Sequence, residues 1–313
     1  MQPPTIKLCC LAILLGLWAP LPAGAQAPAG AQAPAGAQAP ASAQAPPAAQ
    51  APAVPQAPAG AQAPAGAQAP CGGDFATWLH GFEQEAASQG IPQRTIDGAL
   101  GGITYDPAII ARDHAQGVFH QSFAQFSGRM VPPRLVRGRR LLAKYRPLFE
   151  RIEQQFGVPG PVLVALWGLE TDFGADDGKY PTIRALATLA FDCRRADKFR
   201  GELLDALRII DRGDMAAAQM RGAWAGEIGQ TQFLPSSYLK FAVDYDGGGR
   251  RDLIHSTPDA LASTANYLKS YGWQRGQPWG EGTANFQVLL QWNAAEVYTK
   301  TVAYFAQQLA AGQ

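Results

Sequence analysis

The chain has 313 residues, of which 47% are hydrophobic and 16% are charged, and its formal net charge is +1. Lys7 is the only charged residue among the first 70, so acidic and basic side chains balance over the remaining residues. No basic excess indicates nucleic-acid binding, and no long acidic run indicates a disordered acidic tail. The four histidines stand at none of the spacings typical of a zinc enzyme.

Residues 1–27 have the pattern of a secretory signal peptide. Lys7 precedes an apolar stretch from Leu8 to Trp18, and small residues at 23–25 or 25–27 fit a cleavage site. The apolar stretch is too short to span a bilayer, and an uncleaved anchor is the alternative. We therefore expect an exported protein.

A tandem repeat starts at Ala23 and continues to Pro70. Its six-residue unit occurs eight times, five times as AGAQAP. Such a tract buries too little apolar surface to offset its ordering entropy, so we expect residues 28–70 to be a disordered linker. The linker is interpreted either as a spacer or as a low-complexity insert of arbitrary length. Residues 71–313 then form a single globular domain.

Two cysteines, Cys71 and Cys193, remain after removal of the signal peptide. Because an exported protein enters an oxidising compartment, we predict a disulfide between them. Two free thiols are the alternative, since the sequence does not give the distance between them.

Helical patterns dominate the globular part. Asp74 is the predicted cap of a helix that ends near Gly90, and Pro147 is expected to kink or split a long pattern over Leu135–Phe156. Further helices are predicted at Thr182–Leu189, Lys198–Asp211, Ser236–Val243 with Ser236 as its cap, Pro258–Tyr271 and Ala294–Ala310. Asn285–Leu290 is the best strand candidate. The predicted fold class is therefore mainly α (α+β), with at most a small sheet.

The helix predicted from Pro161 is apolar on every side and runs into Glu170. Burial disfavours the ionised carboxylate, and the partial negative charge of the helix C-terminus acts in the same direction. Both raise the pKa of Glu170 towards neutrality, as required of an acid that donates a proton to a glycosidic oxygen near pH 7. The alternative is a structural carboxylate that leaves the core and pairs with an arginine.

A glycine-rich stretch from Arg221 to Tyr238 is the second candidate site segment. Its glycines allow the backbone to approach a ligand closely. Gln232 suits sugar hydroxyls and acetamido groups, and Trp224, Phe233 and Tyr238 offer faces on which sugars stack. The alternative is a turn that leads into the next helix.

Four ordered motifs carry a family resemblance: LWGLETDFG at 166–174, GEIGQTQFLPSSY at 226–238, VDYDGGGRRDL at 243–253 and ANYLKSYGW at 265–273. With them, residues 71–313 resemble bacterial lytic murein transglycosylases of the membrane-bound B family. The resemblance implies a lysozyme-like fold, with Glu170 as the single catalytic acid and base. It also implies substrate contacts by Gln232, Phe233, Tyr267, Trp292 and Phe126, the last standing where the family often has a tyrosine.

The implied reaction is cleavage of the β-1,4 bond between N-acetylmuramic acid and N-acetylglucosamine in peptidoglycan. Glu170 protonates the linking oxygen, and the muramyl acetamido oxygen assists because no second carboxylate is positioned as nucleophile. The ionised Glu170 then accepts a proton from the sugar's own 6-hydroxyl, and a 1,6-anhydro ring closes without water. We expect a monomer that requires no cofactor.

The implied partners are peptidoglycan glycan strands, together with proteins of cell-envelope assembly, and nucleic acid is not among them. The implied location is the periplasm, in association with the cell wall or the outer membrane.

Two positions depart from the family. Ala223 stands where relatives often carry a serine that hydrogen-bonds near the catalytic glutamate. Glu227 is an acid where several relatives are apolar. We hypothesise that Glu227 is a second carboxylate of the site, which raises the pKa of Glu170 by like-charge repulsion. A solvated turn residue is the alternative.

Residues 244–252 resemble a degenerate EF-hand loop, which holds calcium in some relatives. The candidate ligands are Asp244, Asp246, Arg250 through its carbonyl, Asp252 and Asp259. Gly248 replaces the usual ligand at position 5 and His255 the glutamate at position 12. We favour an acidic turn without metal, with a weak calcium site as the alternative.

Two other functions compete with this interpretation. A lysozyme-type hydrolase would use water and release reducing muramic acid, and a non-catalytic module would bind the glycan without cleaving it. Ser237–Lys240 matches the SxxK motif of penicillin-binding proteins, but the motifs that accompany it in those enzymes are missing.

Overall fold

The computed structural model describes residues 71–115 and 121–312. The predicted signal peptide (1–27) and linker (28–70) lie outside the described residues, so the division into domains stays a prediction. Within the described ranges, no helix has both the length and the apolar character needed to cross a membrane.

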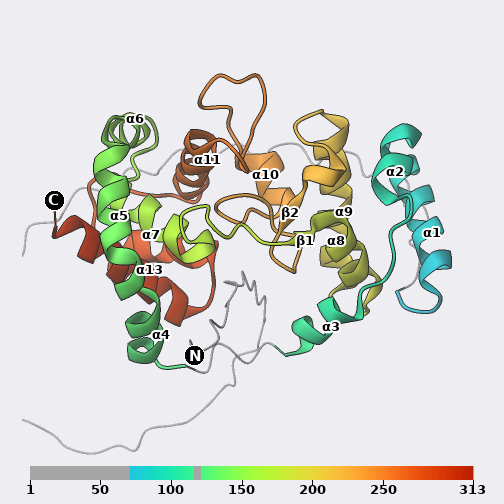
Figure 1. Ribbon diagram of the computed structural model, residues 1–313, viewed down its shortest axis with the longest axis horizontal. Coiled ribbons are helices and arrows are strands. Elements are labelled where there is room, and N and C mark those ends of the chain that lie inside the picture. The colour runs from blue at the N-terminus through green and yellow to red at the C-terminus, as the bar shows by residue number, and fades with distance from the viewer. Residues whose placement is uncertain (1–70, 116–120, 313) are drawn as a thin grey trace, which may run out of the picture. The chain divides into compact units, whose positions relative to one another are not determined.

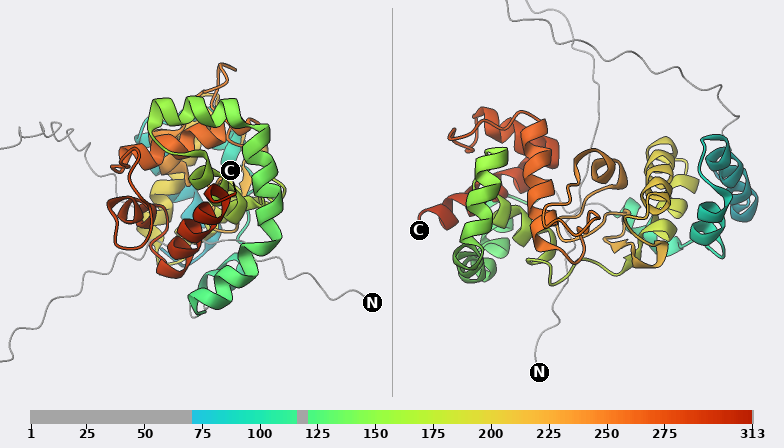
Figure 2. Two further views of the ribbon diagram at one scale, coloured as in Figure 1. Left: turned by 90° about the vertical axis from the view of Figure 1, so that its left-hand side faces the viewer. Right: turned by 90° about the horizontal axis from the view of Figure 1, so that it is seen from above.

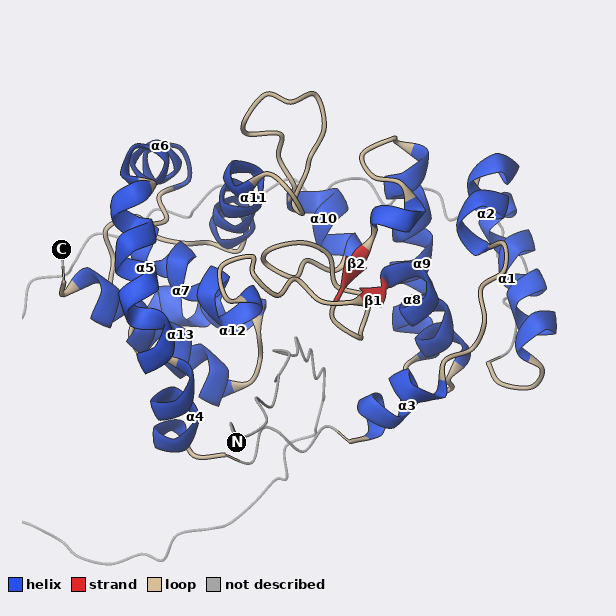
Figure 3. Cartoon of the chain, viewed as in Figure 1, coloured by secondary structure: helices blue, strands red, loops and turns tan. Residues whose placement is uncertain are grey.

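Helices make up most of the described part (Figure 3). They are α1 (Phe75–Ser88), α2 (Gln93–Leu100), α3 (Pro107–His114), α4 (Phe123–Met130), α5 (Pro132–Lys144), α6 (Arg146–Phe156), α7 (Gly160–Thr171), α8 (Thr182–Phe191), α9 (Ala196–Asp211), α10 (Pro235–Phe241), α11 (Thr257–Ser270), α12 (Ala284–Trp292) and α13 (Glu296–Ala310). Two short antiparallel strands, β1 (Tyr180–Pro181) and β2 (Arg221–Gly222), pair Tyr180 with Gly222. The prediction of a mainly α fold with a small sheet is confirmed.

Helix α7 lies at the centre of one group of helices. It packs against α13, α5, α6 and α11, and α4 lies against α13 and α5 (Figure 1). A second group brings α1 and α3 onto α8, and places α2 and α8 against α9. Every residue of α7 is buried, so this helix forms much of the first group's core.

Proline and capping residues explain several helix boundaries. Asp74 caps α1 by accepting a hydrogen bond from the Thr77 amide, as predicted. The long pattern around Pro147 is split into α5 and α6, which meet at a steep angle at Tyr145 (Figure 2). Pro147 occupies the first turn of α6, where its missing N–H would have no helical partner.

Two local predictions were wrong. Asn285–Leu290 belongs to helix α12, which Thr283 caps by accepting from the Phe286 amide. The buried positions of α12 follow a helical period rather than alternation, because Phe286, Leu289 and Trp292 share one face. Ser236 does not cap α10: the helix starts at Pro235, and the Ser236 amide and hydroxyl instead donate to the Glu202 carboxylate.

Three eight-residue helices, α2, α3 and α4, were not predicted. Their local signals are weak, although Asp106 caps α3 ahead of a proline and Ser122 forms a capping box with Gln125 at the start of α4. Short helices of this kind depend on packing against longer neighbours, which the sequence alone does not reveal.

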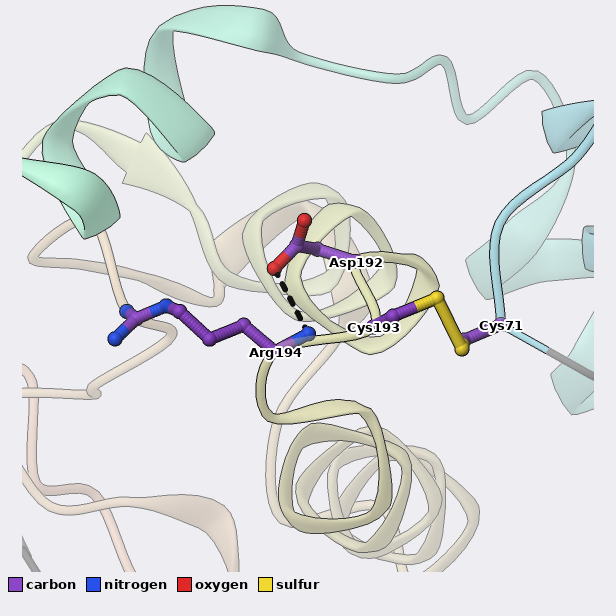
Figure 4. Close-up of a disulfide and its surroundings, with 4 residues drawn as sticks. All are labelled: Cys71, Asp192, Cys193 and Arg194. Atoms are coloured by element: carbon purple, nitrogen blue, oxygen red, sulfur yellow. Dashed lines mark hydrogen bonds between the residues drawn. A yellow bond between two sulfur atoms is a disulfide. The ribbon is translucent and has the colours of Figure 1, made fainter.

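The predicted disulfide between Cys71 and Cys193 is confirmed (Figure 4). It joins the segment before α1 to the turn between α8 and α9, where the Arg194 amide donates to the Asp192 carboxylate. The Gly72 amide donates to the Phe191 carbonyl beside it. The start of the globular part is therefore tied to the second group of helices.

We expect Cys193→Ser to lower the free energy of unfolding by about 3–5 kcal/mol, because the disulfide closes a loop with a sequence separation of 122. Denaturant unfolding under oxidising conditions measures the loss, and with reductant present the wild type and the variant should coincide. Equal stability under oxidising conditions would contradict the stabilising role of the bond.

Candidate active site

Glu170 is the next-to-last residue of α7 and only 7% exposed. The helix forms because Pro161 stands in its first turn and the following residues are apolar all round. The sequence thus carries a carboxylic acid to the end of a fully buried helix. In the ranges that the structure describes, no arginine or lysine pairs with Glu170, so the alternative of an arginine-paired structural carboxylate is wrong.

A constrained turn follows Glu170. Asp172 and Phe173 both adopt left-handed backbone conformations, with φ of 53° and 61°. A Cβ on Gly168 would lie 2.7 Å from the Phe173 ring, so only glycine lets this ring fold back onto the helix. Arg134 donates from Nε to the Gly168 carbonyl at 2.8 Å and lies 3.4 Å from the Asp172 carboxylate. These contacts fix the end of α7 and the direction of Glu170.

Two hydrogen-bond donors converge on one oxygen of Glu170. The Trp292 indole Nε1 donates to Oε1 at 2.8 Å, and the Tyr298 hydroxyl donates to the same atom. Trp292 ends α12 and Tyr298 lies in the first turn of α13. Between them, Asn293 accepts from the Ala295 amide through its side chain and from the Thr299 hydroxyl through its carbonyl. This corner brings both donors to Glu170.

The environment of Glu170 keeps its carboxyl group protonated up to about neutral pH. Burial raises the pKa of Glu170 to about 7, against the lowering effect of the hydrogen bonds from Trp292 and Tyr298, and the charge of Glu227 adds to the rise. Because both donors occupy Oε1, the proton of the neutral acid belongs on Oε2. Glu170 therefore suits proton donation near pH 7.

An aromatic cluster contains three of the predicted substrate contacts. The Phe233 ring centroid lies 5.4 Å from that of Trp292 and 6.1 Å from that of Tyr267, and the Tyr267 and Trp292 centroids are 5.0 Å apart. Tyr267 also donates its hydroxyl to the Gln291 carbonyl at 2.6 Å. Through Trp292 the cluster is linked directly to Glu170.

Hydrogen bonds join the glycine-rich loop to α7 and also link residues within the loop. The Thr171 hydroxyl donates to the Gln230 carbonyl, and reciprocal backbone hydrogen bonds join Ile228 to Phe233. Gln232 is buried: its amide donates to the carbonyls of Asp177 and Gly229, and its oxygen accepts from the Ala223 amide. The polar atoms of Gln232 thus shape the loop, and its substrate contact stays a prediction.

Glu227 lies in the same loop and is only 1% exposed, so the alternative of a solvated turn residue is wrong. Its Oε2 accepts from the Ala225 amide at 3.0 Å, and its buried Oε1 has no hydrogen-bond partner among the described residues. Burial raises the pKa of Glu227 to about 7. Backbone hydrogen bonds from its own amide and from the Ala225 amide, and then the charges of Lys198 and Arg195, act in the opposite direction.

The remaining predicted contact, Phe126, is buried on α4 with the Arg129 guanidinium over its ring. Helix α4 packs against α13, which carries Tyr298. Contact of Phe126 with substrate stays a prediction.

The acidic loop between α10 and α11 projects from the helices (Figure 1). Asp244, Asp246 and Asp259 bring carboxylate oxygens within 4.8 Å of one another. The Asp259 oxygens already accept from three backbone amides, and Asp252 pairs with Arg250 and His255. Calcium takes about six to eight oxygens, including a bidentate carboxylate in EF-hands. Because the oxygens of Asp259 and Asp252 already have partners, we still favour an acidic turn without metal.

Tyr298 and the hydrogen bond from Trp292 to Glu170 were missed by sequence reasoning. Trp292 was predicted only as a sugar contact, and Tyr298, six residues later, was not singled out. Both side chains are large, aromatic and polar at one end, and they lie close together in the sequence. Because buried tyrosine and tryptophan need hydrogen-bond partners, this pattern was the available signal for two donors at the site.

The sequence is similar to a known protein family. Residues 74–284 match the family described as the transglycosylase SLT domain. A curated relative, membrane-bound lytic murein transglycosylase B of Escherichia coli strain K12, is 40% identical over 134 residues, which are 42% of this chain and 37% of that protein. The matched region thus spans little more than a third of that relative's length.

Solved structures show the same fold. SltB3 from Pseudomonas aeruginosa, in complex with NAG-NAM-pentapeptide, has a TM-score of 0.73 at 31% identity, over 77% of this chain and 81% of that one. The Escherichia coli lytic transglycosylase Slt35, in complex with calcium, has a TM-score of 0.69 at 25% identity, over 77% of this chain and 96% of that one. The predicted lysozyme-like fold, that of the lytic transglycosylases, is confirmed.

We expect Glu170→Gln to stabilise the fold at pH 8 by about 2–3 kcal/mol and to leave it nearly unchanged at pH 4. The native Glu170 pKa is raised above the unfolded value of 4.5 to about 7, so the native state binds more protons between these values and loses stability as the pH rises.

Denaturant unfolding at both pH values measures this difference. Glu150→Gln, at an exposed position of α6, is the control and should show no pH-dependent change. An effect of Glu170→Gln that is equal at pH 4 and pH 8 would contradict the raised pKa.

Proposed function

Because this chain belongs to the transglycosylase SLT domain family, we propose that it is a lytic transglycosylase of peptidoglycan. It cleaves the β-1,4 bond from N-acetylmuramic acid to N-acetylglucosamine and leaves a 1,6-anhydro end on the muramic acid. The observation that carries the proposal is the buried Glu170 carboxyl, held through one oxygen by Trp292 and Tyr298. SltB3, a relative at 31–32% identity, has been crystallised with NAG-NAM-pentapeptide and with NAG-anhNAM-pentapeptide.

In the first step, Glu170 gives the proton on Oε2 to the oxygen that links the two sugars. The bond between this oxygen and C1 of the muramic acid breaks, and positive charge develops at C1. The acetamido oxygen of the same sugar bonds to C1 and replaces the carboxylate nucleophile of retaining glycosidases. The N-acetylglucosamine fragment leaves with a free hydroxyl.

In the second step, Glu170 acts as the base. Its carboxylate accepts the proton of the 6-hydroxyl while O6 bonds to C1 and the acetamido oxygen leaves. The anhydro ring closes, Glu170 is protonated again, and no water is consumed. One residue serves both steps because its pKa lies near the working pH.

The donors on Oε1 make the second step possible. Burial alone favours the neutral acid, whereas Trp292 and Tyr298 stabilise the carboxylate formed in the first step. Their aromatic rings also exclude water around Oε1, and a dry site favours ring closure over hydrolysis. Gln232, Phe233, Tyr267, Trp292 and Phe126 are the proposed contacts for the glycan.

The proposed reaction requires no cofactor, because both proton transfers use Glu170 and the sugar's own hydroxyl. Slt35 is described in complex with calcium. In the acidic loop of this chain, the carboxylates of Asp244, Asp246 and Asp259 lie together, and the Asp259 oxygens already accept from three backbone amides. No step of the proposed reaction depends on this loop.

The proposed location is the periplasm, at the cell wall or the outer membrane. The proposed form is a monomer that acts on glycan strands and binds proteins of envelope assembly. The N-terminal sequence pattern and a relative named as membrane-bound support this location.

We expect the wild type to release 1,6-anhydromuramyl products from purified peptidoglycan, and Glu170→Gln to lower their formation by roughly 10³-fold. Mass spectrometry of the digest separates anhydro ends from reducing ends by one water. Reducing products would favour a lysozyme-type hydrolase, binding without turnover by the wild type would favour a glycan-binding module, and undiminished turnover by the variant would exclude Glu170 as the catalyst.

We expect Tyr298→Phe to move the alkaline limb of kcat/KM upward by about one pH unit and to lower kcat about tenfold. Removing the hydroxyl withdraws a hydrogen bond from the carboxylate, so the pKa of Glu170 rises and the base of the second step becomes harder to form. The control is Tyr304→Phe, at a half-exposed position of the same helix. A pH profile of Tyr298→Phe identical to that of the wild type would contradict this role.

A further inference from the structure

Positive charge is concentrated on helix α5 and the start of α6. No aspartate or glutamate stands between Asp113 and Glu150, whereas this stretch holds seven arginine and lysine residues. Because the globular part as a whole has equal numbers of acidic and basic residues, the rest of it is net acidic. The balanced net charge therefore conceals one strongly basic region, and such a region attracts anionic partners.

Five of these side chains form a surface that we call the basic patch: Arg137, Arg139, Arg140, Lys144 and Arg146. All five are exposed, and α5 and α6 run along the outer edge of the first group of helices (Figure 2). The opposite side of α5 packs on the core through Gly138 and Leu142. The charges of the basic patch thus face solvent together.

Few of these charges are neutralised within the protein. Arg137 lies 3.7 Å from the Asp172 carboxylate. The other four cations of the basic patch make no ion pair within residues 71–115 and 121–312. Arg139 donates to the Gln308 carbonyl, which carries no charge. Neighbouring positive charges without counter-charges repel one another, so an external anionic surface would stabilise them.

Apolar side chains lie next to the basic patch. Val136, on the exposed side of α5, is 57% exposed. Between α5 and α6 there is a hollow of about 330 Å³, whose buried lining residues include Leu142, Phe149 and Leu309. Arg139 and Arg146 line the same hollow from exposed positions, and Glu150 and Glu153 line it from α6.

This combination of apolar surface and positive charge distinguishes between anionic partners. An anionic phospholipid carries a phosphate directly beside apolar chains, so it matches both parts. A free phosphate ion has no apolar part, and a glycan strand with carboxylate-bearing peptides is polar along most of its length. The observations therefore favour a lipid surface.

We propose that the basic patch is a docking surface for a membrane that contains anionic phospholipids. Its arginine and lysine side chains pair with lipid phosphates, and Val136 and the hollow contact the apolar part of the interface. Binding of this kind is reversible and weakens as salt is added. The inference goes beyond the proposed function, because the reaction at Glu170 does not use the basic patch.

The test compares the triple variant Arg140→Gln/Lys144→Gln/Arg146→Gln with the wild type, each purified after export so that the predicted signal peptide is absent. Protein is sedimented with vesicles of phosphatidylcholine alone, or with vesicles of equal parts phosphatidylcholine and phosphatidylglycerol. We expect the wild type to prefer the anionic vesicles and to lose this preference at high salt. The triple variant should bind the anionic vesicles roughly 100-fold more weakly.

The matched control is Arg112→Gln/Lys179→Gln/Lys240→Gln, at three exposed positions outside the basic patch. It has the same net charge as the test variant and should bind anionic vesicles nearly as the wild type does, because binding depends on where the charges lie. Both variants should keep the wild-type Tm, since the exchanged side chains are exposed.

Equal binding by the wild type and the test variant, or an equal loss in both variants, would overturn the proposal. A wild type without preference for anionic vesicles would also overturn it. If the test variant then bound purified peptidoglycan more weakly than the wild type, the partner would be the carboxylates of the cell wall.

Turnover of peptidoglycan without vesicles separates this proposal from the proposed function. The wild type and the test variant should turn over equally, because the basic patch lies outside the catalytic site. Absence of turnover in the wild type would contradict the proposed function, and vesicle binding would still decide on the docking surface.

Discussion

The structure depends on one unfavourable arrangement, the burial of the Glu170 carboxyl at the end of an apolar helix. Among the described residues, two side chains donate hydrogen bonds to this carboxyl, Trp292 and Tyr298, and both bind the same oxygen. The acid therefore keeps its proton near neutral pH, while its carboxylate is still stable enough to form during a reaction. Acid and base chemistry by one residue needs both conditions.

The surrounding elements hold the Glu170 carboxyl in place, although its burial destabilises the fold. Gly168 and the left-handed Phe173 close the end of α7, and Arg134 binds the carbonyl exposed there. Thr171 ties the glycine-rich loop to the helix, and the corner at Asn293 brings in the two donors. Segments more than 100 residues apart in the sequence thus meet at Glu170. A second buried acid, Glu227, extends the unfavourable region, as expected where function opposes stability.

The sequence predicted the parts of the fold that depend on strong local patterns. The apolar run before Glu170 predicted both a buried helix and a raised pKa, and Pro147 predicted the division into α5 and α6. The segment 285–290 was misinterpreted because a short apolar run fits a strand or a helix, and the cap at Thr283 decided between them.

The sequence predicted which residues form the site better than it predicted the contacts between them. Phe233, Tyr267 and Trp292 do come together, but the hydrogen bonds to Glu170 depend on the corner between α12 and α13. Burial of Glu227 likewise depends on packing of the loop, so the sequence left a solvated residue and a site carboxylate equally open.

The most direct measurement is infrared difference spectroscopy of the wild type against Glu170→Gln, recorded from pH 4 to pH 9. We expect a neutral carboxylic acid band that belongs to Glu170 and disappears with a midpoint near pH 7. Disappearance of this band near pH 4.5, the ordinary range of glutamate, would contradict the raised pKa of Glu170.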